Sequence, residues 1–294
     1  MSDLPAALAF LGVQEPLESA AVAVLPVPYD LTTTYQPGAR FGPRAILTAS
    51  HDVELFDEEL RWDPSLAGIH TLQPLEPLAT GPEAMIARIA ERIGGLFAAG
   101  KFPVVLGGDH SVSIGVFEAL ANHWENPWIL QFDAHADLRS AYQGSPFSHA
   151  CVMARAREAF SCVQVGIRSW SEDEEGPLWE HPGRVFSARE AEDDPRGVAA
   201  RLSEVLGDPV YVTVDLDCLD PAVMPATGTP EPGGLSWRVL TGLLRTVAER
   251  RHVIGFDLSE LSPIPGFVAP DFLAARLAAK MIGYVFHPRP SAGA

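Results

Sequence analysis

The sequence has few cysteines, few basic residues and no long apolar run. Only 3 of its 294 residues are cysteines, too few for the disulfide framework of a small secreted protein or for a zinc site built from thiolates. We therefore expect Cys151, Cys162 and Cys218 to be buried, reduced thiols. No apolar run reaches the roughly 18–20 residues that a membrane-spanning helix needs. The N-terminus shows no signal cleavage site, and these features together predict a cytoplasmic protein without a membrane partner.

Positive charge is also scarce. Lys and Arg number 21 against 38 Asp and Glu, a formal net charge of −17. Nucleic-acid binding needs a basic surface, and the basic residues form no dense cluster, so we expect no nucleic-acid partner. An acidic surface favours cations instead. With 47% apolar and 20% charged residues, the composition is that of a globular protein.

Short β-branched apolar runs alternate with longer amphipathic stretches along the chain. This alternation predicts an α/β fold in which helices cover both faces of a mostly parallel β-sheet. We expect one domain over 1–294, with an N-terminal arm at 1–20 and a disordered tail at 287–294. The expected strands are 21–27, 102–106, 128–132, 162–167, 209–216 and 252–258; the expected helices are 43–50, 82–100, 111–123, 195–206, 237–251 and 270–286.

Three of the expected strands end in residues that commonly bind metals. The first runs into Gly107 and Gly108, which allow a sharp turn before Asp109 and His110. A Gly-Gly turn with a helix-capping Asp or Ser explains this motif equally well. In open parallel sheets, however, binding sites gather beyond the carboxyl ends of the strands.

The second motif is DAHAD and the third is DLDCLDP. Alternation along an extended chain would place Asp133, His135 and Asp137 on one face, if the strand persists that far. The same alternation would place Asp215 and Asp217 together. Separately, each motif could also be a helix cap or a solvated loop. Paired carboxylates at the end of an apolar strand repel each other, and a cation would relieve that repulsion.

The types of ligand narrow the choice of metal. Oxygen and imidazole donors without thiolates favour a hard divalent ion such as Mn²⁺ over structural zinc. Six donors exceed what one open site takes from protein, so we expect two ions that share a bridging water and make it a nucleophile at neutral pH. The six expected ligands are His110, Asp133, His135, Asp137, Asp215 and Asp217.

GGDHS, DAHAD, DLDCLDP and FDLSELSP occur here in the order and approximate spacing of the ureohydrolases, the arginase and agmatinase family. The resemblance covers the chain from about Val22 to Phe286. It implies a three-layer α/β/α arginase-like fold with a binuclear manganese site, two Mn²⁺ per subunit. It also implies that Asp133 and Asp215 bridge the two ions, and that the protein is a homo-oligomer, a trimer or hexamer.

The same resemblance suggests roles for three residues. The family hydrolyses a guanidino group to urea and an amine by attack of a metal-bridging hydroxide. Asp137 would take the proton of the nucleophile and pass it to the leaving nitrogen. His149 matches a loop histidine that shuttles protons or contacts substrate, and Glu260 matches a glutamate that pairs with the substrate guanidinium. Asp257 is expected to be structural.

The motifs resemble the agmatinase branch most closely, which predicts agmatine as the cationic substrate and putrescine as the product, in polyamine metabolism. Arg139 stands where arginases carry an asparagine. This disfavours arginine, but it leaves aminopropylagmatine, guanidinobutyrate and formiminoglutamate open. Two other classes remain as alternatives: a single-zinc deacetylase on a similar fold, and a metal-free nucleotide- or phosphate-binding module that uses the GGDHS turn.

Overall fold

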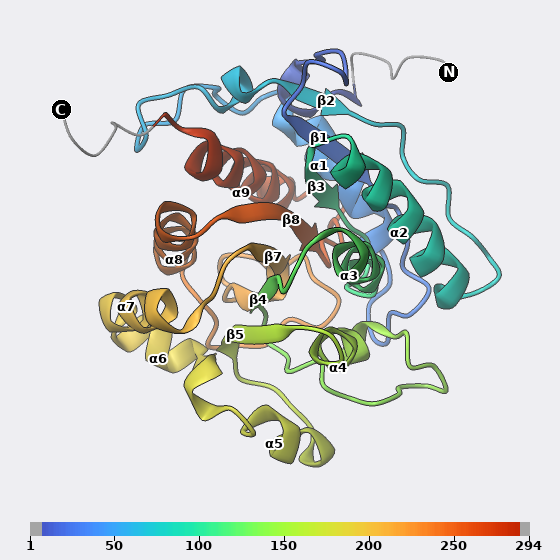
Figure 1. Cartoon of the computed structure of the whole chain (residues 1–294), viewed down its shortest axis with the longest axis vertical. Helices are drawn as coiled ribbons and strands as arrows, with labels where there is room; N and C mark the ends of the chain where they lie inside the picture. Colours follow the sequence, from blue (N-terminus) through green and yellow to red (C-terminus); the bar gives the residue numbers. More distant parts are fainter. Residues whose placement is uncertain (1–7, 289–294) are drawn as a thin grey trace.

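An eight-stranded, wholly parallel β-sheet runs through the centre of the molecule (Figure 1). The computed structural model describes residues 8–288. The strand order is β2-β1-β3-β8-β7-β4-β5-β6, so β3, β8, β7 and β4 are adjacent at the centre. The strands are β1 (Val22–Pro26), β2 (Ile69–Thr71), β3 (Phe102–Leu106), β4 (Trp128–Phe132), β5 (Ser161–Ile167), β6 (Val185–Ser187), β7 (Val210–Asp215) and β8 (Val253–Ser259).

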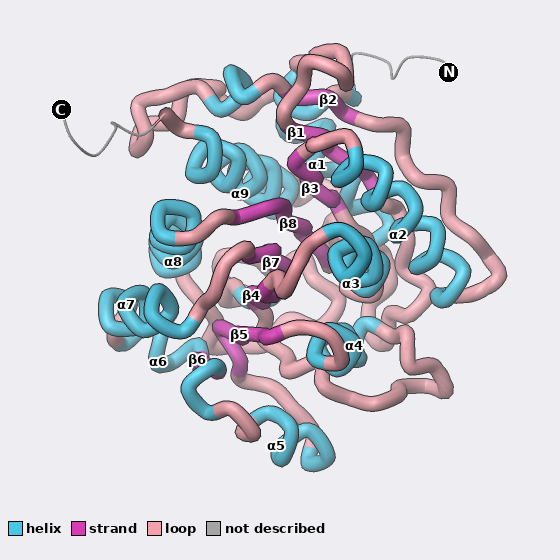
Figure 2. The backbone as a smooth tube through the Cα atoms, viewed as in Figure 1, coloured by secondary structure: helices cyan, strands magenta, loops and turns pink. Residues whose placement is uncertain are grey.

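Helices cover both faces of this sheet (Figure 2). One apolar core lies beneath α1, α7, α8 and α9, and the other lies beneath α2, α3 and α4. The predicted three-layer α/β/α fold is therefore confirmed. The helices are α1 (Gly42–Ser50), α2 (Pro82–Ala98), α3 (Val112–His123), α4 (Val152–Arg157), α5 (Glu172–Leu178), α6 (Ala188–Asp193), α7 (Pro195–Val205), α8 (Trp237–Arg250) and α9 (Ala269–Phe286).

All six expected strands and all six expected helices are present, within two residues at each end. Two strands and three helices were missed, β2, β6, α4, α5 and α6, and each has at most seven residues. Such short segments show too few turns or alternations for a period to be recognised. The acidic runs 171–175 and 190–194 lie at the start of α5 and the end of α6.

The N-terminal arm packs against the body of the protein where it is described, since Phe10 is fully buried in the core. Residues 1–7 of that arm and 289–294 of the predicted tail lie outside the described residues. All three cysteines are buried and free, as predicted. Between residues 8 and 288, no helix is both long and apolar enough to cross a membrane.

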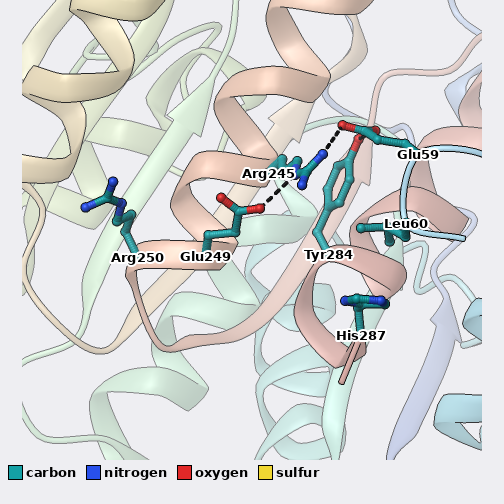
Figure 3. A pocket seen from close by; sticks show the side chains of 7 residues that line it. All are labelled: Glu59, Leu60, Arg245, Glu249, Arg250, Tyr284 and His287. Carbon is teal, nitrogen blue, oxygen red and sulfur yellow. Dashed lines mark hydrogen bonds and ion pairs between the residues drawn. The ribbon is translucent and has the colours of Figure 1, made fainter. Parts of the chain in front are cut away.

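A buried lysine joins α9 to the loop before β2. Lys280 is 4% exposed, and its Nζ lies 2.8 Å from Asp57 Oδ2 and 3.2 Å from Glu59 Oε2. Glu59 also accepts hydrogen bonds from Tyr284 and Arg245, and Arg245 reaches Glu249 on its own helix (Figure 3). Burying two charges costs free energy, so the intact ion pair stabilises the fold only a little. Removing one partner destabilises the fold by more, because the other charge stays buried without compensation.

Lys280→Met is therefore expected to lower the free energy of unfolding by about 3 kcal/mol, because the Asp57 carboxylate stays buried without its cation. Urea denaturation at pH 7 measures this. Burial alone would raise the pKa of Asp57. Hydrogen bonds from Lys280, Leu60 and Glu59 outweigh this effect and hold the pKa of Asp57 below its ordinary value. The stabilisation is thus fully present at pH 7 and is lost as the pH falls through the folded-state pKa.

The matched control is the double variant Asp57→Asn with Lys280→Met, which removes both charges. It should recover most of the lost stability. A double variant as unstable as Lys280→Met alone would show that packing of the lysine stem, rather than the buried charge, sets the cost.

Candidate metal centre

The turn after β3 presents His110 at the carboxyl edge of the sheet. A Cβ on Gly108 would lie 1.7 Å from the carbonyl oxygen of Tyr29, so only glycine fits there. His110 is 1% exposed, and its Nε2 lies 2.9 Å from Thr213 Oγ1. The Thr213 hydroxyl donates its one proton to Asp257 Oδ1 at 2.7 Å, so it must accept from Nε2–H. Asp257 thus orients Thr213, which is the structural role expected for it. With its proton on Nε2, His110 keeps a lone pair on Nδ1 that can bind a metal ion.

Strand β4 ends at Phe132, before the DAHAD ligands. Asp133 is held by Gln131 Nε2 at 2.7 Å and by the backbone N–H of His135 at 2.7 Å. Asp137 then adopts a left-handed backbone conformation with φ 52°. The expectation that these residues converge by strand alternation was wrong, because the extended chain stops before them. They converge because the chain turns.

The DLDCLDP motif behaves in the same way. Strand β7 ends at Asp215, and Asp217 lies in a 3₁₀ turn, Leu216–Cys218, rather than on an extended segment. Asp215 Oδ1 accepts the Asp217 backbone N–H at 2.8 Å. Asp217 Oδ1 accepts the Ala134 N–H at 3.1 Å, which joins the β7 turn to the β4 turn.

The six predicted ligands come together in two groups that share Asp133. His110 Nδ1 lies 3.0 Å from Asp133 Oδ2, 3.1 Å from Asp137 Oδ2 and 3.4 Å from Asp215 Oδ2. His135 Nδ1 lies 3.0 Å from Asp217 Oδ2 and 3.6 Å from Asp133 Oδ1. The two oxygens of Asp133 thus face one group each.

These separations fit ligands around a cation. An octahedral shell with bonds of about 2.1 Å places neighbouring donors about 3 Å apart. His110 Nδ1 is buried and makes no hydrogen bond of proper geometry to the nearby carboxylates. A buried imidazole nitrogen this close to three carboxylates, without a hydrogen bond of proper geometry to any of them, is placed to bind a cation between them. All are oxygen or imidazole nitrogen atoms, which suit a hard divalent ion.

The charges of the site also favour a bound cation. Burial and the charge of Asp133 raise the pKa of Asp137 to about 7. Burial, Asp217 and Asp133 raise the pKa of Asp215 well above its usual value. Although burial opposes it, the charges of Asp217 and Asp133 raise the pKa of His135 to about 12. The carboxylates are therefore too crowded to be ionised together unless positive charge is supplied.

His149 begins a 3₁₀ turn before α4, and a chain of hydrogen bonds holds it there. Its backbone N–H donates to Thr32 Oγ1 at 3.0 Å. The N–H and hydroxyl of Thr32 both donate to Asp109 Oδ2, at 2.8 and 2.9 Å. Burial lowers the pKa of His149 despite the opposing charge of Asp109, so the imidazole is neutral at pH 7.

Glu260 contacts the backbone of His110. Its Oε1 accepts the backbone N–H of His110 at 2.7 Å, and burial and the charge of Asp109 raise its pKa well above the usual value. A Cβ on Gly228 would lie 3.7 Å from Glu260 Oε2, so this second oxygen faces the loop after β7. Glu260 does not line the cavity that opens over the ligands.

That cavity has a volume of about 320 Å³ and is built from the loops after β1, β4, β5 and β7. It reaches the ligands His135 and Asp137, and His149 forms part of its wall. The other lining residues are Thr34, Ala136, Arg139, Tyr142, Ala150, Ser169, Trp170, Ser171, Glu174 and Thr229.

The structure accounts for Arg139, which the sequence left unexplained. Its guanidinium lies 4.8 Å from the centre of the Tyr142 ring, and its Nε lies 3.8 Å from Glu174 Oε2. Glu174 is 4% exposed and also accepts the N–H of Leu138 and of Ser171. The positive charge of Arg139 is therefore compensated within the cavity wall.

Sequence reasoning missed Thr32 and Glu174 and assigned no role to Trp170. Thr32 lies in a plain threonine run, and its bond to Asp109 crosses 77 residues. Glu174 had one available signal: Ser171 and Glu174 have the Ser-x-x-Glu spacing of a capping box, which the structure contains. The acidic run does lie at a helix end, and within it Glu174 is buried.

The site predicts binding of divalent cations. Mn²⁺ should raise the melting temperature of metal-stripped protein, because it relieves repulsion among carboxylates that only the folded state brings together. Asp133→Asn and Asp215→Asn should abolish most of this rise, as measured by calorimetry. Asp63→Asn, far from the site in a turn before β2, is the control and should keep it. Full Mn²⁺ stabilisation of both site variants would show that the ligands are misassigned.

Comparisons with known proteins show which family the chain belongs to. The arginase family profile matches residues 20–284. The chain is 38% identical to the N(1)-aminopropylagmatine ureohydrolase of Synechocystis sp., over 90% of this chain and 89% of that protein. It is 34% identical to the agmatinase of Bacillus subtilis, over 87% of this chain and 88% of that protein.

Among solved structures, the proclavaminate amidino hydrolase of Streptomyces clavuligerus superposes with a TM-score of 0.87 at 29% identity, covering 97% of each chain. These matches each extend over most of the chain. The chain therefore belongs to the arginase family of ureohydrolases.

Proposed function

We propose that this ureohydrolase uses two Mn²⁺ ions to cleave a cationic, linear guanidino compound, agmatine or N1-aminopropylagmatine, to urea and an amine. The observation that carries the proposal is the pair of ligand groups that share Asp133 at the floor of a cavity. The relatives named aminopropylagmatine ureohydrolase and agmatinase support the substrate class. Agmatine would give putrescine, which places the reaction in polyamine metabolism, and a cytoplasmic location stays a prediction.

Each ion would have its own set of donors. We assign His110, Asp133, Asp137 and Asp215 to one ion, and Asp133, His135, Asp215 and Asp217 to the other, with Asp133 and Asp215 as bridges. The contact of Asp215 Oδ2 with His110 Nδ1 supports its place in the first set. When bound, the two ions would lower the pKa of a water molecule enough to make it a nucleophile at neutral pH.

The chain's own residues handle the protons. Hydrolysis requires the attacking water to lose a proton and the leaving nitrogen to gain one, since an amine leaves only when protonated. Asp137 lines the cavity, so its carboxylate can accept the first proton and deliver it to the leaving nitrogen. His149, neutral and in the same wall, can hydrogen-bond the guanidino group and relay a proton to solvent.

Glu260 is proposed to fix both the site and the substrate. Oε1 holds the backbone of His110. Oε2 faces the loop that carries Thr229, a cavity residue, and could accept a hydrogen bond from the substrate guanidinium there. This contact with substrate is a prediction that follows from the family resemblance.

The alternatives fit the site less well. A single-zinc deacetylase would leave several of the six donors without an ion. Arginine, guanidinobutyrate or formiminoglutamate would bring a carboxylate, yet Arg139 is already compensated by Glu174 and Tyr142. The GGDHS turn delivers His110 to the ligand group rather than presenting a phosphate loop.

We also propose a homo-oligomer. Phe41, Val268 and Phe272 are 62%, 70% and 39% exposed and line one hollow between α1 and α9. A second copy of the chain could cover these apolar side chains. The trimer or hexamer implied by the family stays a prediction, and a monomer in sedimentation velocity would contradict it.

The function is tested by urea release. Wild-type enzyme loaded with Mn²⁺ should release urea from agmatine or N1-aminopropylagmatine, and removal of the metal by a chelator should abolish turnover. Asp215→Asn should lower kcat/KM by at least roughly a thousandfold, because a bridging carboxylate is lost. Asp63→Asn serves again as the surface control. No urea from any cationic guanidine, or full activity without metal, would refute the proposal.

The hydrogen-bond chain to His149 gives a second prediction. Thr32→Val keeps the backbone N–H on Asp109 but loses the hydroxyl that receives the His149 N–H, so His149 should lose its fixed position. We expect kcat to fall roughly tenfold, as is typical for weakened general acid–base catalysis, with Mn²⁺ binding unchanged. Thr32→Ser retains the hydroxyl and should retain activity. Equal loss in both variants would mean that the hydroxyl does not position His149.

A further inference from the structure

Trp170 is an exposed aromatic residue in the wall of the cavity. Its indole is 41% exposed, whereas the ligands at the cavity floor, apart from His135, are at most 6% exposed. The residue therefore lies toward the mouth of the cavity. A guanidino group at the ligands would have its tail directed along the wall toward this mouth.

The indole is held in place from several directions. Ser169, its neighbour, pairs with His135 in a parallel bridge, and the Ser169 carbonyl accepts the Ala136 N–H at 3.1 Å. The indole Nε1–H donates to Glu175, and the ring packs edge-to-face with Trp179 at 6.2 Å between centroids. An exposed tryptophan with this much support is a fixed platform, which loses little entropy when a ligand binds.

Carboxylates flank this platform. Glu231 Oε1 accepts the Ser169 hydroxyl at 3.2 Å, and the Glu231 carbonyl accepts from Arg168 at 2.6 Å, so the loop after β7 is tied beside Trp170. Glu175 lies at the indole nitrogen. Among the residues that line the cavity, the one arginine, Arg139, is compensated by Glu174 and Tyr142. Arg168 does not line the cavity, and its guanidinium donates to backbone carbonyls, including those of Asp217 and Glu231. With Glu231 and Glu175 beside it, the cavity side of Trp170 therefore suits a cation.

We propose that Trp170, with Glu231 beside it, binds the distal ammonium group of the substrate tail and selects a guanidine with a long, doubly aminated tail. A tryptophan face is the best aromatic surface for an ammonium ion. Agmatine ends after four methylene groups, whereas N1-aminopropylagmatine continues through a secondary amine to a second, primary one. The longer tail therefore carries an ammonium group farther from the guanidino carbon than agmatine does. This inference rests on the proposed function and deepens it.

The test compares three substrates that share the reacting group: N1-aminopropylagmatine, agmatine and n-butylguanidine, which has no tail amine. Trp170→Ala should lower kcat/KM for N1-aminopropylagmatine roughly tenfold, mainly through KM, as expected for loss of a cation–π contact. Agmatine should be affected less and n-butylguanidine least. Trp170→Phe should lie between wild type and Trp170→Ala, because a smaller aromatic face remains.

Further variants separate binding from packing. Glu231→Gln keeps the size of the side chain and should raise the KM for N1-aminopropylagmatine several-fold with kcat unchanged. Phe56→Ala removes an exposed aromatic residue that does not line the cavity, and it should leave all three substrates unaffected. The Mn²⁺-dependent rise in melting temperature checks that each variant retains its metal site.

The outcomes are distinct. An equal loss for all three substrates in both Trp170 variants would make Trp170 a packing residue and overturn the subsite, as would unchanged discrimination between the substrates. In either case the urea released by wild-type enzyme would leave the proposed function standing. A wild-type enzyme that releases no urea from any of the three would overturn the proposed function itself, and the subsite with it.

Discussion

Repulsion among buried carboxylates is the constraint on which this structure depends. Four aspartates, each at most 6% exposed, meet at the carboxyl edge of the sheet: Asp133, Asp137, Asp215 and Asp217. Burial and the charge of Asp133 raise the pKa of Asp137 to about 7. Although burial opposes it, the charges of Asp217 and Asp133 raise the pKa of His135 to about 12, so the site holds protons when no other positive charge is supplied. Divalent cations would replace those protons. Repulsion among these carboxylates therefore lowers the stability of the metal-free fold, and binding of metal would raise it.

The parallel sheet makes this crowding possible. In the strand order, β3, β8, β7 and β4 are neighbours, so the segments after them meet although they are far apart in the sequence. The first ligand follows β3, and later ones follow β4 and β7. Between them, β8 contributes the buried Asp257, which accepts from Thr213, and Glu260 directly after β8 accepts the backbone N–H of His110. The central strands thus provide both the ligands and the groups that orient them.

The sequence by itself determined the layers of the fold and which residues to consider as metal ligands. The apolar runs 102–106 and 128–132 and the amphipathic stretch 82–100 were predicted to within two residues at each end, because apolar runs and helical periodicity are local properties of the sequence. The six predicted ligands were recognisable because acids and imidazoles are unusual directly after apolar strands. The resemblance to the ureohydrolases rests on the same short motifs.

Only the tertiary structure decided how those residues converge. Asp137 reaches the site through a left-handed turn and Asp217 through a 3₁₀ turn, neither of which follows from strand alternation. Thr32 and Glu174 gain their importance from contacts across 77 and 36 residues. Arg139 depends on a distant contact too, because Glu174 in the cavity wall compensates its positive charge. Such contacts form only when distant loops pack together, so local sequence patterns cannot predict them.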